Sequence, residues 1–550
     1  MTRAPGRLAR RIAAAARNSA DRAAITFLDD QLAPRTYTFG ELIAAATQIA
    51  DRLASTGVDR SLPLGILLRT HEEQVLHYLG ALFAGAVPAI LAPPNRKLNR
   101  EYYTETMAAV LEQSGFSAVI TDLDEIAAGY PSMTPWSLQQ RDGQALRSDS
   151  GTSVDPNVSF MQFSSGTTGI KRGVLVTDEA VLAQLESYAA ALRLSQDDVI
   201  VSWLPLYHDM GFIACLNLPL AFGVHTVMLD PVDWVTDPSR FLLAATRYGA
   251  TLSWNPNFAY AFMGQRVPEA RLSGVDLSSV RGLVNCSEPV TEESQRMFAD
   301  RFAAYGLAGD AFVGCYAMAE TVFALTHGDR RDPDHLDWTG PVEDARREGS
   351  RAYVSVGRPL AGVDLRVFAD DGDELGDRRI GELWVRSPFN LSGYYRNPEA
   401  TTAAFQGEWY RTGDLGYRVG DAFYVVGRKK DVLIVGGVNV FPQDLEDLVS
   451  ELKGVKPGRV SAFGQFDPRQ QTDRVVVLAE SELEGEEARQ AVLGIRQRVQ
   501  AAFHITGFKV HLVPAGWLVK STAGKMARGA NREKWEAQQD RLRQADSTRA

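Results

Sequence analysis

Residues 158–173 read VSFMQFSSGTTGIKRG, in which an apolar segment runs directly into a loop of serine, threonine and glycine. Three glycines, Gly166, Gly169 and Gly173, let the backbone turn tightly and point amides at an anion. The hydroxyl groups of the loop add further donors. The loop lacks the G-x4-G-K-[ST] spacing of the common nucleotide-hydrolase motif. Taken alone, the stretch is also consistent with a simple polar turn, so the motifs around it have to decide.

The rest of the chain shows three different patterns of apolar, polar and turn residues. Over about residues 24–350, short apolar runs such as AAITFL at 23–28 and LPLGILL at 62–68 alternate with longer segments of helical period. This alternation predicts an α/β fold of mostly parallel sheets that helices cover. From about 353 to 426, short segments between Gly- and Asp-rich turns predict a small antiparallel β-barrel.

The third pattern, over residues 429–550, is typical of an α+β unit. We expect it to be a small, mobile C-terminal domain beside a large N-terminal domain of residues 1–428. Its polar tail, residues 537–550, is expected to be disordered. The Arg- and Ala-rich start of the chain has the composition of a transit peptide, but Arg is frequent throughout and a surface helix is the favoured interpretation.

The composition is that of an ordinary globular protein, with 45% hydrophobic and 23% charged residues. A net charge of -10 argues against a nucleic-acid partner, which needs a basic face. The cysteines, Cys215, Cys286 and Cys315, form no disulfide or metal-ligand pattern, and we expect them to be core residues in a reducing cytoplasm. No apolar run reaches the ~18 residues that a membrane span needs, so no membrane insertion is expected.

Five further motifs carry groups suited to chemistry. WLPLYHDMGF at 203–212 places His208 after an apolar strand, and VGCYAMAET at 313–321 offers the ring of Tyr316 for a base and the carboxylate of Glu320 for Mg²⁺. The others are WYRTGDLG at 409–416, GRKKD at 427–431 with GGVNVFPQDLE at 436–446, and STAGKMAR at 521–528. In isolation, each of these residues is equally consistent with a structural role in the core, at a helix end or on the surface.

In this order, the six motifs make the chain similar to the adenylate-forming superfamily of acyl-CoA ligases, peptide-synthetase adenylation domains and luciferases. The likeness covers about residues 24–535. It implies ATP- and Mg²⁺-dependent joining of a carboxylic acid to AMP, with release of pyrophosphate. It also implies a C-terminal domain that rotates about a hinge, for which the matching position is Lys430.

The resemblance assigns a role to each motif. The implied nucleotide-binding residues are Ser164, Ser165, Gly166, Thr167, Thr168, Gly169, Arg172, Ser287, Glu288, Pro289, Tyr316, Ala317, Met318, Thr321, Asp414 and Arg428. The implied catalytic residues are Lys525, Glu320 and His208, with Glu320 as the Mg²⁺ ligand. Tyr316 is expected to lie near adenine and Asp414 to accept both ribose hydroxyls. Lys525 is expected to bridge the carboxylate and the α-phosphate, a task suited to a point cation on a long stem.

Several segments resemble the fatty acyl-AMP ligases, which pass the acyl group to the phosphopantetheine thiol of an acyl carrier protein. These segments are SWLPLYHDMGF, LSWNPNFAYAFM, CSEPV and IVGGVNVFPQDLE. The long segment between Glu320 and Gly357 also fits the insertion of that branch. Transfer to free coenzyme A, and an amino or aryl acid as the substrate, remain the alternatives.

Three departures from the family pattern indicate a specialised member. Lys171-Arg172 replaces the usual Pro-Lys, Ala317 replaces a Gly, and the lead-in to the last motif lacks its usual Pro. None of them removes an essential functional group. The acyl pocket is expected near the apolar residues that neighbour the motifs, which are Phe212, Trp254, Phe258, Met318 and Val322. Each of these is also consistent with a core role.

Overall fold

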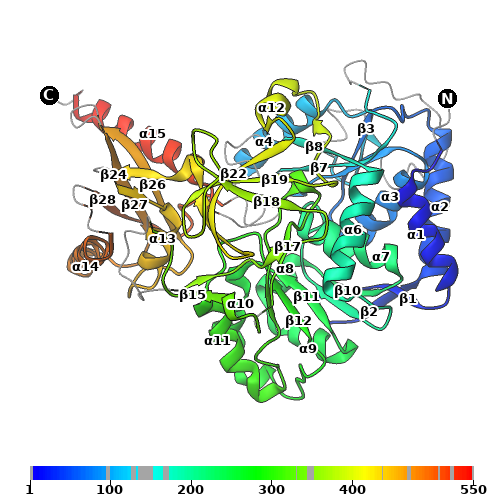
Figure 1. Cartoon of the computed structure of the whole chain (residues 1–550), viewed down its shortest axis with the longest axis horizontal. Coiled ribbons are helices and arrows are strands. Elements are labelled where there is room, and N and C mark those ends of the chain that lie inside the picture. The colour runs from blue at the N-terminus through cyan, green and yellow to red at the C-terminus, as the bar shows by residue number, and fades with distance from the viewer. Residues whose placement is uncertain are drawn as a thin grey trace.

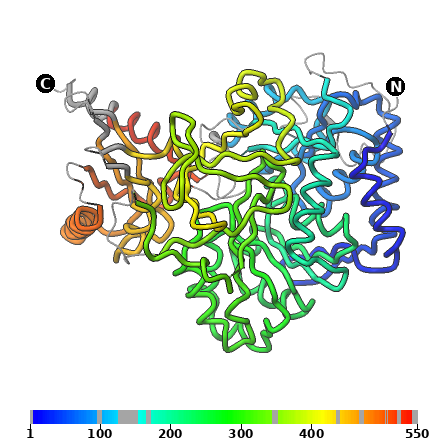
Figure 2. Tube along the Cα trace, viewed as in Figure 1, coloured from blue at the N-terminus to red at the C-terminus, as the bar shows by residue number. Residues whose placement is uncertain are grey.

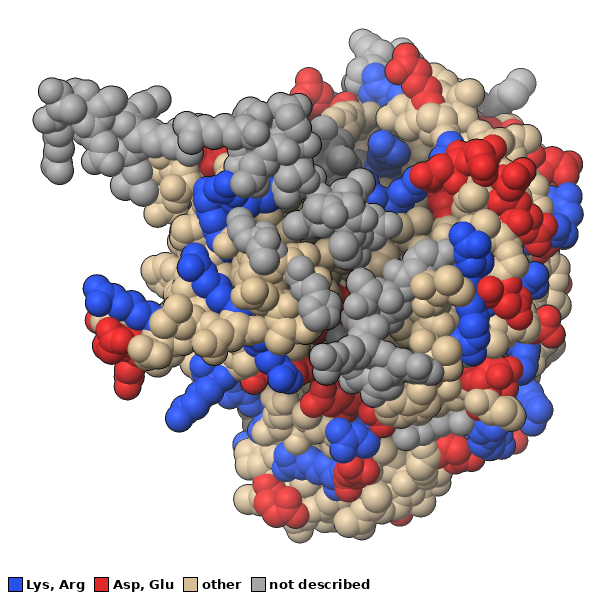
Figure 3. Space-filling view, turned by 60° about the vertical axis from the view of Figure 1, so that its left-hand side comes forward, with Lys and Arg blue, Asp and Glu red and all other residues tan. Residues whose placement is uncertain are grey.

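The structure is a computed structural model (Figure 1). It describes residues 4–94, 100–124, 132–133, 153–164, 172–329, 331–342, 352–435, 438–467, 472–503, 505, 508–520 and 526–547. Among these residues, no helix is both long and apolar enough to cross a membrane. Figure 3 shows that positive and negative side chains are interspersed over the described part of one face.

The largest sheet has seven strands in the order β13-β12-β11-β9-β10-β1-β2. Their bounds are Phe312–Gly314, Gly282–Asn285, Leu252–Asn255, Val199–Ser202, His225–Leu229, Ala23–Leu28 and Pro34–Thr38. Every pair is parallel except β1 with β2, which confirms the predicted mostly parallel sheet. In the central part, β11 and β12 are buried along their whole length and β9 is buried except at Val199, as expected for a sheet covered by helices.

The helices that pack around this sheet include α1 (Arg7–Asn18), α6 (Asp178–Leu192), α9 (Ser239–Tyr248), α10 (Asn257–Arg266) and α11 (Glu292–Phe302). Helix α1 confirms the predicted helix at the start of the chain, and it buries Leu8 and Ile12 on one face. The carboxyl group of Asp178 caps it by accepting from the backbone N–H groups of Arg7 (2.6 Å) and Leu8 (2.9 Å). The N-terminal helix is therefore an integral part of the core.

Two smaller sheets complete the α/β part. One is parallel, β4-β3-β5-β6, with bounds Val87–Ile90, Pro63–Leu67, Ala118–Thr121 and Ser132–Met133. The other is antiparallel, β20-β8-β7, with bounds Gly393–Tyr394, Gly173–Thr177 and Val158–Phe163. In the second sheet, β7 and β8 flank the Ser164–Arg172 loop, so that loop joins two paired strands.

The predicted barrel at 353–426 is an antiparallel sheet that curls into a half-barrel (Figure 1). Its order is β18-β19-β22-β21, with β23 also paired to β22, and its bounds are Asp364–Phe368, Gly381–Arg386, Trp409–Val419, Phe405–Gln406 and Ala422–Arg428. The antiparallel prediction is confirmed. Closure depends on pairing between distant strands, which local sequence does not encode.

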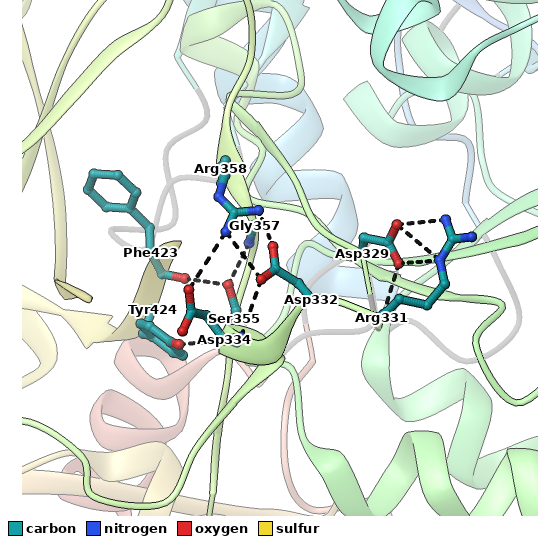
Figure 4. Close-up of polar contacts among 9 residues, drawn as sticks. All are labelled: Asp329, Arg331, Asp332, Asp334, Ser355, Gly357, Arg358, Phe423 and Tyr424. Atoms are coloured by element: carbon teal, nitrogen blue, oxygen red, sulfur yellow. Dashed lines mark hydrogen bonds and ion pairs between the residues drawn. The ribbon is translucent and has the colours of Figure 1, made fainter. Parts of the chain in front are cut away.

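The segment before the half-barrel is tied to it by polar contacts (Figure 4). Arg358 on β17 (Arg358–Pro359) pairs with Asp332 and lies 3.6 Å from Asp334. The Tyr424 hydroxyl on β23 donates to the Asp334 carbonyl (2.5 Å), and the Ser355 hydroxyl donates to the Phe423 carbonyl (3.3 Å). These contacts fix both described ends of the long segment that resembles the branch-specific insertion; residues 343–351 lie outside the described residues.

The C-terminal elements form an α+β unit (Figure 2). The hairpin β24–β25 (Leu433–Val435, Val438–Val440) precedes the sheet β26-β27-β28 (Val460–Asp467, Thr472–Glu480, Lys509–Val513), and helices α13 (Pro442–Ser450), α14 (Gly485–Phe503) and α15 (Arg528–Ser547) accompany them. Leu445, Val499 and Phe503 bury their side chains in a separate apolar core. Helix α15 extends to Ser547, so it includes most of the tail that was expected to be disordered.

Candidate active site

The predicted motifs follow the carboxyl ends of neighbouring parallel strands. His208 comes after β9, Ser287 after β12 and Tyr316 after β13. Strands β12 and β13 pair in register through Asn285 and Gly314, which places the two motifs side by side. Ligands of open α/β sheets bind outside the carboxyl ends of the strands, so this edge is the expected site.

Tyr316, Asp414 and Arg428 come from distant parts of the sequence and meet at this edge. The Tyr316 hydroxyl donates to Asp414 Oδ2 (2.7 Å), and Arg428 Nε lies 3.2 Å from Asp414 Oδ1. The antiparallel register of β22 and β23 sets Asp414 directly opposite Arg428. Burial and the charge of Asp414 raise the pKa of Tyr316, and Asp414 raises the pKa of Arg428. Asp414 is therefore a buried acceptor with a cation beside it.

Glu320 lies in a 3₁₀ turn, η4 (Ala319–Thr321), next to this group. Its Oε1 atom accepts from the Tyr394 hydroxyl (3.1 Å), which lies 3.2 Å from the Tyr410 hydroxyl. Burial raises the pKa of Glu320 above its usual value. No ion pair to Glu320 occurs among the described residues. A part-buried carboxylate without an ion pair costs stability, even with Arg428 near enough to act on it, so Glu320 is a candidate to bind a positive ligand.

The residues present fit a magnesium ion if one protein carboxylate binds it together with substrate phosphates and water. Within the described part of the chain, no group of three or more His, Cys, Asp or Glu side chains is arranged as a metal site. Mg²⁺ commonly binds through one or two carboxylates together with substrate phosphates and water. Glu320 can supply such a carboxylate.

The two ends of the Ser164–Arg172 loop are closed by a hydrogen bond from Ser164 N–H to the Arg172 carbonyl (3.0 Å). The Arg172 guanidinium lies 5.3 Å from the centre of the Tyr394 ring, beside Glu320. The strands that carry the loop thus bring its two described ends, Ser164 and Arg172, toward the Glu320 turn. The predicted phosphate contacts Ser165, Gly166, Thr167, Thr168 and Gly169 lie outside the described residues.

Gln162, on the strand that leads into this loop, was missed by the sequence analysis. Its Nε2 group donates to the carbonyls of Ala319 (2.7 Å) and Val322 (2.9 Å), so it bonds the loop strand to the Glu320 turn. The side chain is buried. The signal in the sequence was the one amide in the segment VSFMQF, whose only other polar residue is Ser159.

The remaining predicted nucleotide residues surround the same edge. Ser287 has a left-handed backbone (φ 67°), and the Glu288 carboxylate accepts from the Phe258 N–H (3.0 Å). Ala317 pairs with Ala324 in a β-bridge that closes the turn containing Met318. Pro289 follows Glu288 directly in the chain. These positions shape the turns beside Tyr316.

The hydroxyl of Thr321, by contrast, points into the protein. It lies 3.3 Å from the carbonyls of Met318 and Phe323, and the residue is fully buried. A contact from this hydroxyl to a phosphate would require the turn to open. The prediction for Thr321 is therefore the one that the local geometry favours least.

His208 lies just before a π-helix, η1 (Met210–Asn217). Its Nδ1 atom is 3.1 Å from Asp209 Oδ1, and the same oxygen accepts from the Met210 N–H (2.8 Å). π-Helical turns occur often at functional sites because they displace side chains from the regular helical ladder. Here the turn carries His208 to the strand edge with one ring nitrogen oriented by Asp209.

The predicted acyl-pocket residues differ in their surroundings. Phe212 packs edge-on against Tyr78 and Phe160 in the core. Trp254 is fully buried, and its indole N–H donates to the Tyr188 hydroxyl (2.8 Å). Phe258 is 38% exposed, Met318 is half-buried, and Val322 is buried with φ 64°.

The C-terminal motifs flank the site from the other side. Lys525 lies outside the described residues, but Lys520 forms a β-bridge with Met526 on its far side. Burial lowers the pKa of Lys520, with Arg459 acting in the same direction and Glu288 in the opposite one. Burial and Arg428 lower the pKa of Lys430. Lys520 and Lys430 are thus each influenced by the charge of a predicted site residue, Glu288 for Lys520 and Arg428 for Lys430.

Comparison with known proteins identifies the family. Residues 12–395 match the model of the AMP-binding enzyme family. A probable long-chain-fatty-acid–AMP ligase, FadD30 of Mycobacterium tuberculosis, is 31% identical over 90% of this chain and 91% of its own. A putative fatty-acid–CoA ligase, fadD21 of Mycobacterium leprae, is 28% identical over 92% of this chain and 93% of its own.

Solved structures agree with this assignment. The fatty acid AMP ligase from Legionella pneumophila has a TM-score of 0.70 at 26% identity and covers 96% of both chains. A second structure, described as fatty acyl-adenylate ligases from E. coli and L. pneumophila, shares the fold with a TM-score of 0.85 at 24% identity over 97% of this chain and 98% of that one. The chain therefore belongs to the AMP-binding enzyme family, and it is an ATP-using ligase that forms acyl-adenylates from carboxylic acids.

Proposed function

We propose that this ligase activates a fatty or related acyl acid with Mg-ATP and then transfers the acyl group to the phosphopantetheine thiol of an acyl carrier protein in the cytoplasm. The observation that carries the nucleotide half of the proposal is the Tyr316–Asp414–Arg428 group beside Glu320. The relatives named as fatty-acid AMP ligases support the acyl class. The free, buried cysteines are in keeping with a reducing compartment.

Each part of the site has a task in the first half-reaction. The carboxylate and ATP are both anions, so the site must align them and neutralise charge. Asp414 accepts the ribose hydroxyls, Tyr316 lines the base, and Arg428 balances the Asp414 charge. The loop of residues 164–172, with Arg172 at its end, holds the β- and γ-phosphates. His208 lies on the side of the site where the carboxylic acid substrate would bind.

Glu320 would hold the magnesium ion, which supplies charge neutralisation on the phosphates when bound. Lys525 stabilises the charge that develops between the attacking carboxylate and the α-phosphate, and pyrophosphate leaves. Loss of such a group from a closed site costs ~3–4 kcal/mol of transition-state stabilisation, or two to three decades of rate. Lys525→Ala should therefore retain ATP binding and lose adenylation; adenylation above about a tenth of the wild-type rate would refute the role.

We propose that the acyl pocket runs from the motif edge toward Trp254, which is buried and bonded to Tyr188. The assignment predicts that Trp254→Ala shifts the preferred acid toward longer chains in a pyrophosphate-release panel. Phe258, Met318, Val322 and Phe212 would line the remainder, with the first two nearest to solvent. An unchanged chain-length profile for Trp254→Ala would remove Trp254 from the pocket.

For the second half-reaction, we place the domain boundary after residue 428 and the pivot at Lys430. Rotation there would carry Lys525 away once the adenylate exists and admit the thiol. Lys430→Pro should spare pyrophosphate release and slow thiol transfer, whereas equal loss of both would contradict a pivot at this residue.

Two acceptors and two further acid classes remain to be separated by experiment. The likeness to a relative named as a fatty-acid–CoA ligase keeps free coenzyme A as the second candidate. We would measure pyrophosphate release across fatty, aryl and amino acids, and then offer the best acid with coenzyme A and with a holo carrier protein together. An intact-mass increase on the carrier alone supports the proposal, and acyl-coenzyme A as the main product rejects it.

A further inference from the structure

Three of the four consecutive residues from Arg428 to Asp431 are bonded to different parts of the molecule. Arg428 pairs with Asp414 at the predicted ribose site. Lys429 pairs with the half-barrel, and Asp431 pairs with the C-terminal unit through Arg528. Lys430, between the last two, makes no ion pair among the described residues. The predicted pivot therefore lies between two oppositely directed anchors.

The first anchor is a buried carboxylate. Lys429 Nζ lies 3.0 Å from Glu382 Oε2 on β19, and it also pairs with Asp370 (2.6 Å). Glu382 is 4% exposed, and its carboxylate also pairs with Arg411 (3.0 Å) and accepts from the Gly413 N–H (3.3 Å). Burial acts to raise the pKa of Glu382, but Arg411 and Lys429 together hold it below its usual value. Lys429 is thus fixed to the half-barrel by an ionised group.

The second anchor is a three-point contact made by Arg528. Its Nη1 group donates to Asp431 Oδ2 (2.8 Å), while Nε and Nη2 donate to the two oxygens of Glu446 on α13 (2.8 and 2.7 Å). Glu446 Oε1 also accepts from the Ala462 N–H on β26 (2.9 Å). A planar guanidinium that bridges two carboxylates in this manner fixes orientation as well as distance.

Arg528 begins helix α15, three residues after Lys525. The base of the intervening segment is built from the Lys520–Met526 bridge and from the Ala527 N–H, which donates to the Val519 carbonyl (3.2 Å). The buried Asn531 adds two bonds to the Val519 backbone (2.7 and 3.0 Å). The chain that carries Lys525 therefore leaves a rigid base, and Arg528 connects that base to the residue after the pivot.

We propose that Arg528 is a positioning residue for adenylation, which registers the Lys525 segment against the pivot through Asp431 and Glu446, while Lys429 holds the other side of the pivot to the half-barrel. This inference rests on the proposed function, because it takes Lys525 as the catalytic cation and Lys430 as the pivot. In this arrangement only Lys430 is left to change conformation when the C-terminal unit turns.

The consequence is a specific kinetic pattern. Without Arg528, the Lys525 side chain keeps its positive charge but is no longer held in position. A displacement of about 1 Å in a catalytic group can lower the rate ~100-fold. The ATP contacts of Asp414, Tyr316 and Glu320 are on the other side of the pivot and stay intact. Arg528→Ala should therefore lower kcat for pyrophosphate release by about 100-fold and leave KM for ATP within about twofold.

The test compares Arg528→Ala, Arg528→Lys and Asp431→Asn with the wild type, all in the full chain. Arg528→Lys keeps one charge but cannot bridge both carboxylates, so it should recover part of kcat. Arg532→Ala is the matched control, since Arg532 lies one turn further along α15 and makes only an exposed pair with Glu536. Its kcat and KM should equal those of the wild type.

Each outcome decides the proposal. The predicted fall in kcat at constant KM, with partial recovery in Arg528→Lys, supports it. An unchanged kcat, or a rise in KM for ATP that parallels the fall in kcat, overturns it, the latter because it indicates general loss of structure. If Arg528→Ala does not fold, Asp431→Asn, which leaves the Arg528–Glu446 pair in place, must show the same pattern or the proposal fails. Lys525→Ala is run beside them: if it adenylates normally, the proposed function itself is wrong.

Discussion

Replacing Gln162 by Leu tests whether the phosphate-loop strand and the Glu320 turn act as one unit. The substitution keeps the volume roughly constant and removes two hydrogen bonds, to the carbonyls of Ala319 (2.7 Å) and Val322 (2.9 Å). The Ala319 carbonyl keeps a bond from the Val322 N–H (3.2 Å), so the larger penalty falls on the Val322 carbonyl. With about 1 kcal/mol for the lost bond to Ala319 and 1–3 kcal/mol for leaving the buried Val322 carbonyl unpaired, the free energy of unfolding should fall by about 2–4 kcal/mol.

The effect on activity shows whether Gln162 positions Glu320 for catalysis or only stabilises the fold. If Gln162 sets the position of Glu320, kcat should fall about 10- to 100-fold, and the Mg²⁺ concentration for half-maximal pyrophosphate release should rise. Gln295→Leu is the matched control, because Gln295 is equally buried on α11 and its side-chain amide has no hydrogen-bond partner among the described residues. Urea unfolding and a Mg²⁺ titration of pyrophosphate release measure both effects. A loss of stability with wild-type kcat and Mg²⁺ dependence would refute the coupling.

Three further predictions concern the site and its frame. Because burial raises the pKa of Glu320, its protonated form favours folding, and that contribution is lost as the pH rises through the raised pKa. Glu320→Gln should thus lose adenylation yet melt above the wild type at neutral pH, with a gap that closes in acid; a pH-independent gap would exclude this cause. Asp414→Asn should raise KM for ATP by about tenfold or more, because it removes a charge-assisted acceptor, and an unchanged KM in pyrophosphate exchange would exclude a ribose contact. Gly357→Ala should cost more than about 4 kcal/mol in urea unfolding, because a Cβ would lie 2.1 Å from the His327 carbonyl carbon. Gly372→Ala has the same φ of 94° with its nearest neighbour at 3.6 Å, and it should cost far less.

The sequence was most informative where chemistry and local pattern coincide. Tyr316, Asp414 and Arg428 were each recognisable from their motifs, and the alternation of apolar runs predicted the parallel sheet correctly. Their mutual contacts were not predictable, because the meeting of β13 with β22 and β23 depends on the packing of the whole molecule. The open half-barrel has the same origin, since closure is a property of strand number and register rather than of any one segment.

The residues that were missed share a different reason. Gln162 appears in the sequence as one polar residue of a strand, and only the tertiary structure shows the two carbonyls that it serves. The buried partner of Lys429, Glu382, belongs to a motif-free strand. Thr321 shows the converse, because its hydroxyl is turned inward although its motif suggested a phosphate contact. Positioning residues leave little trace in a sequence because their partners are backbone groups or distant side chains.

The most direct test of the account is the identity of the products when the enzyme meets Mg-ATP and a panel of fatty acids without any thiol acceptor. Attack on the α-phosphate requires that one equivalent of acyl-AMP and one of pyrophosphate accumulate on the enzyme, as seen by mass spectrometry and phosphate analysis. Lys525→Ala should form neither while it still binds ATP. Formation of ADP and inorganic phosphate, or an ATP turnover that no carboxylic acid stimulates, would contradict the account.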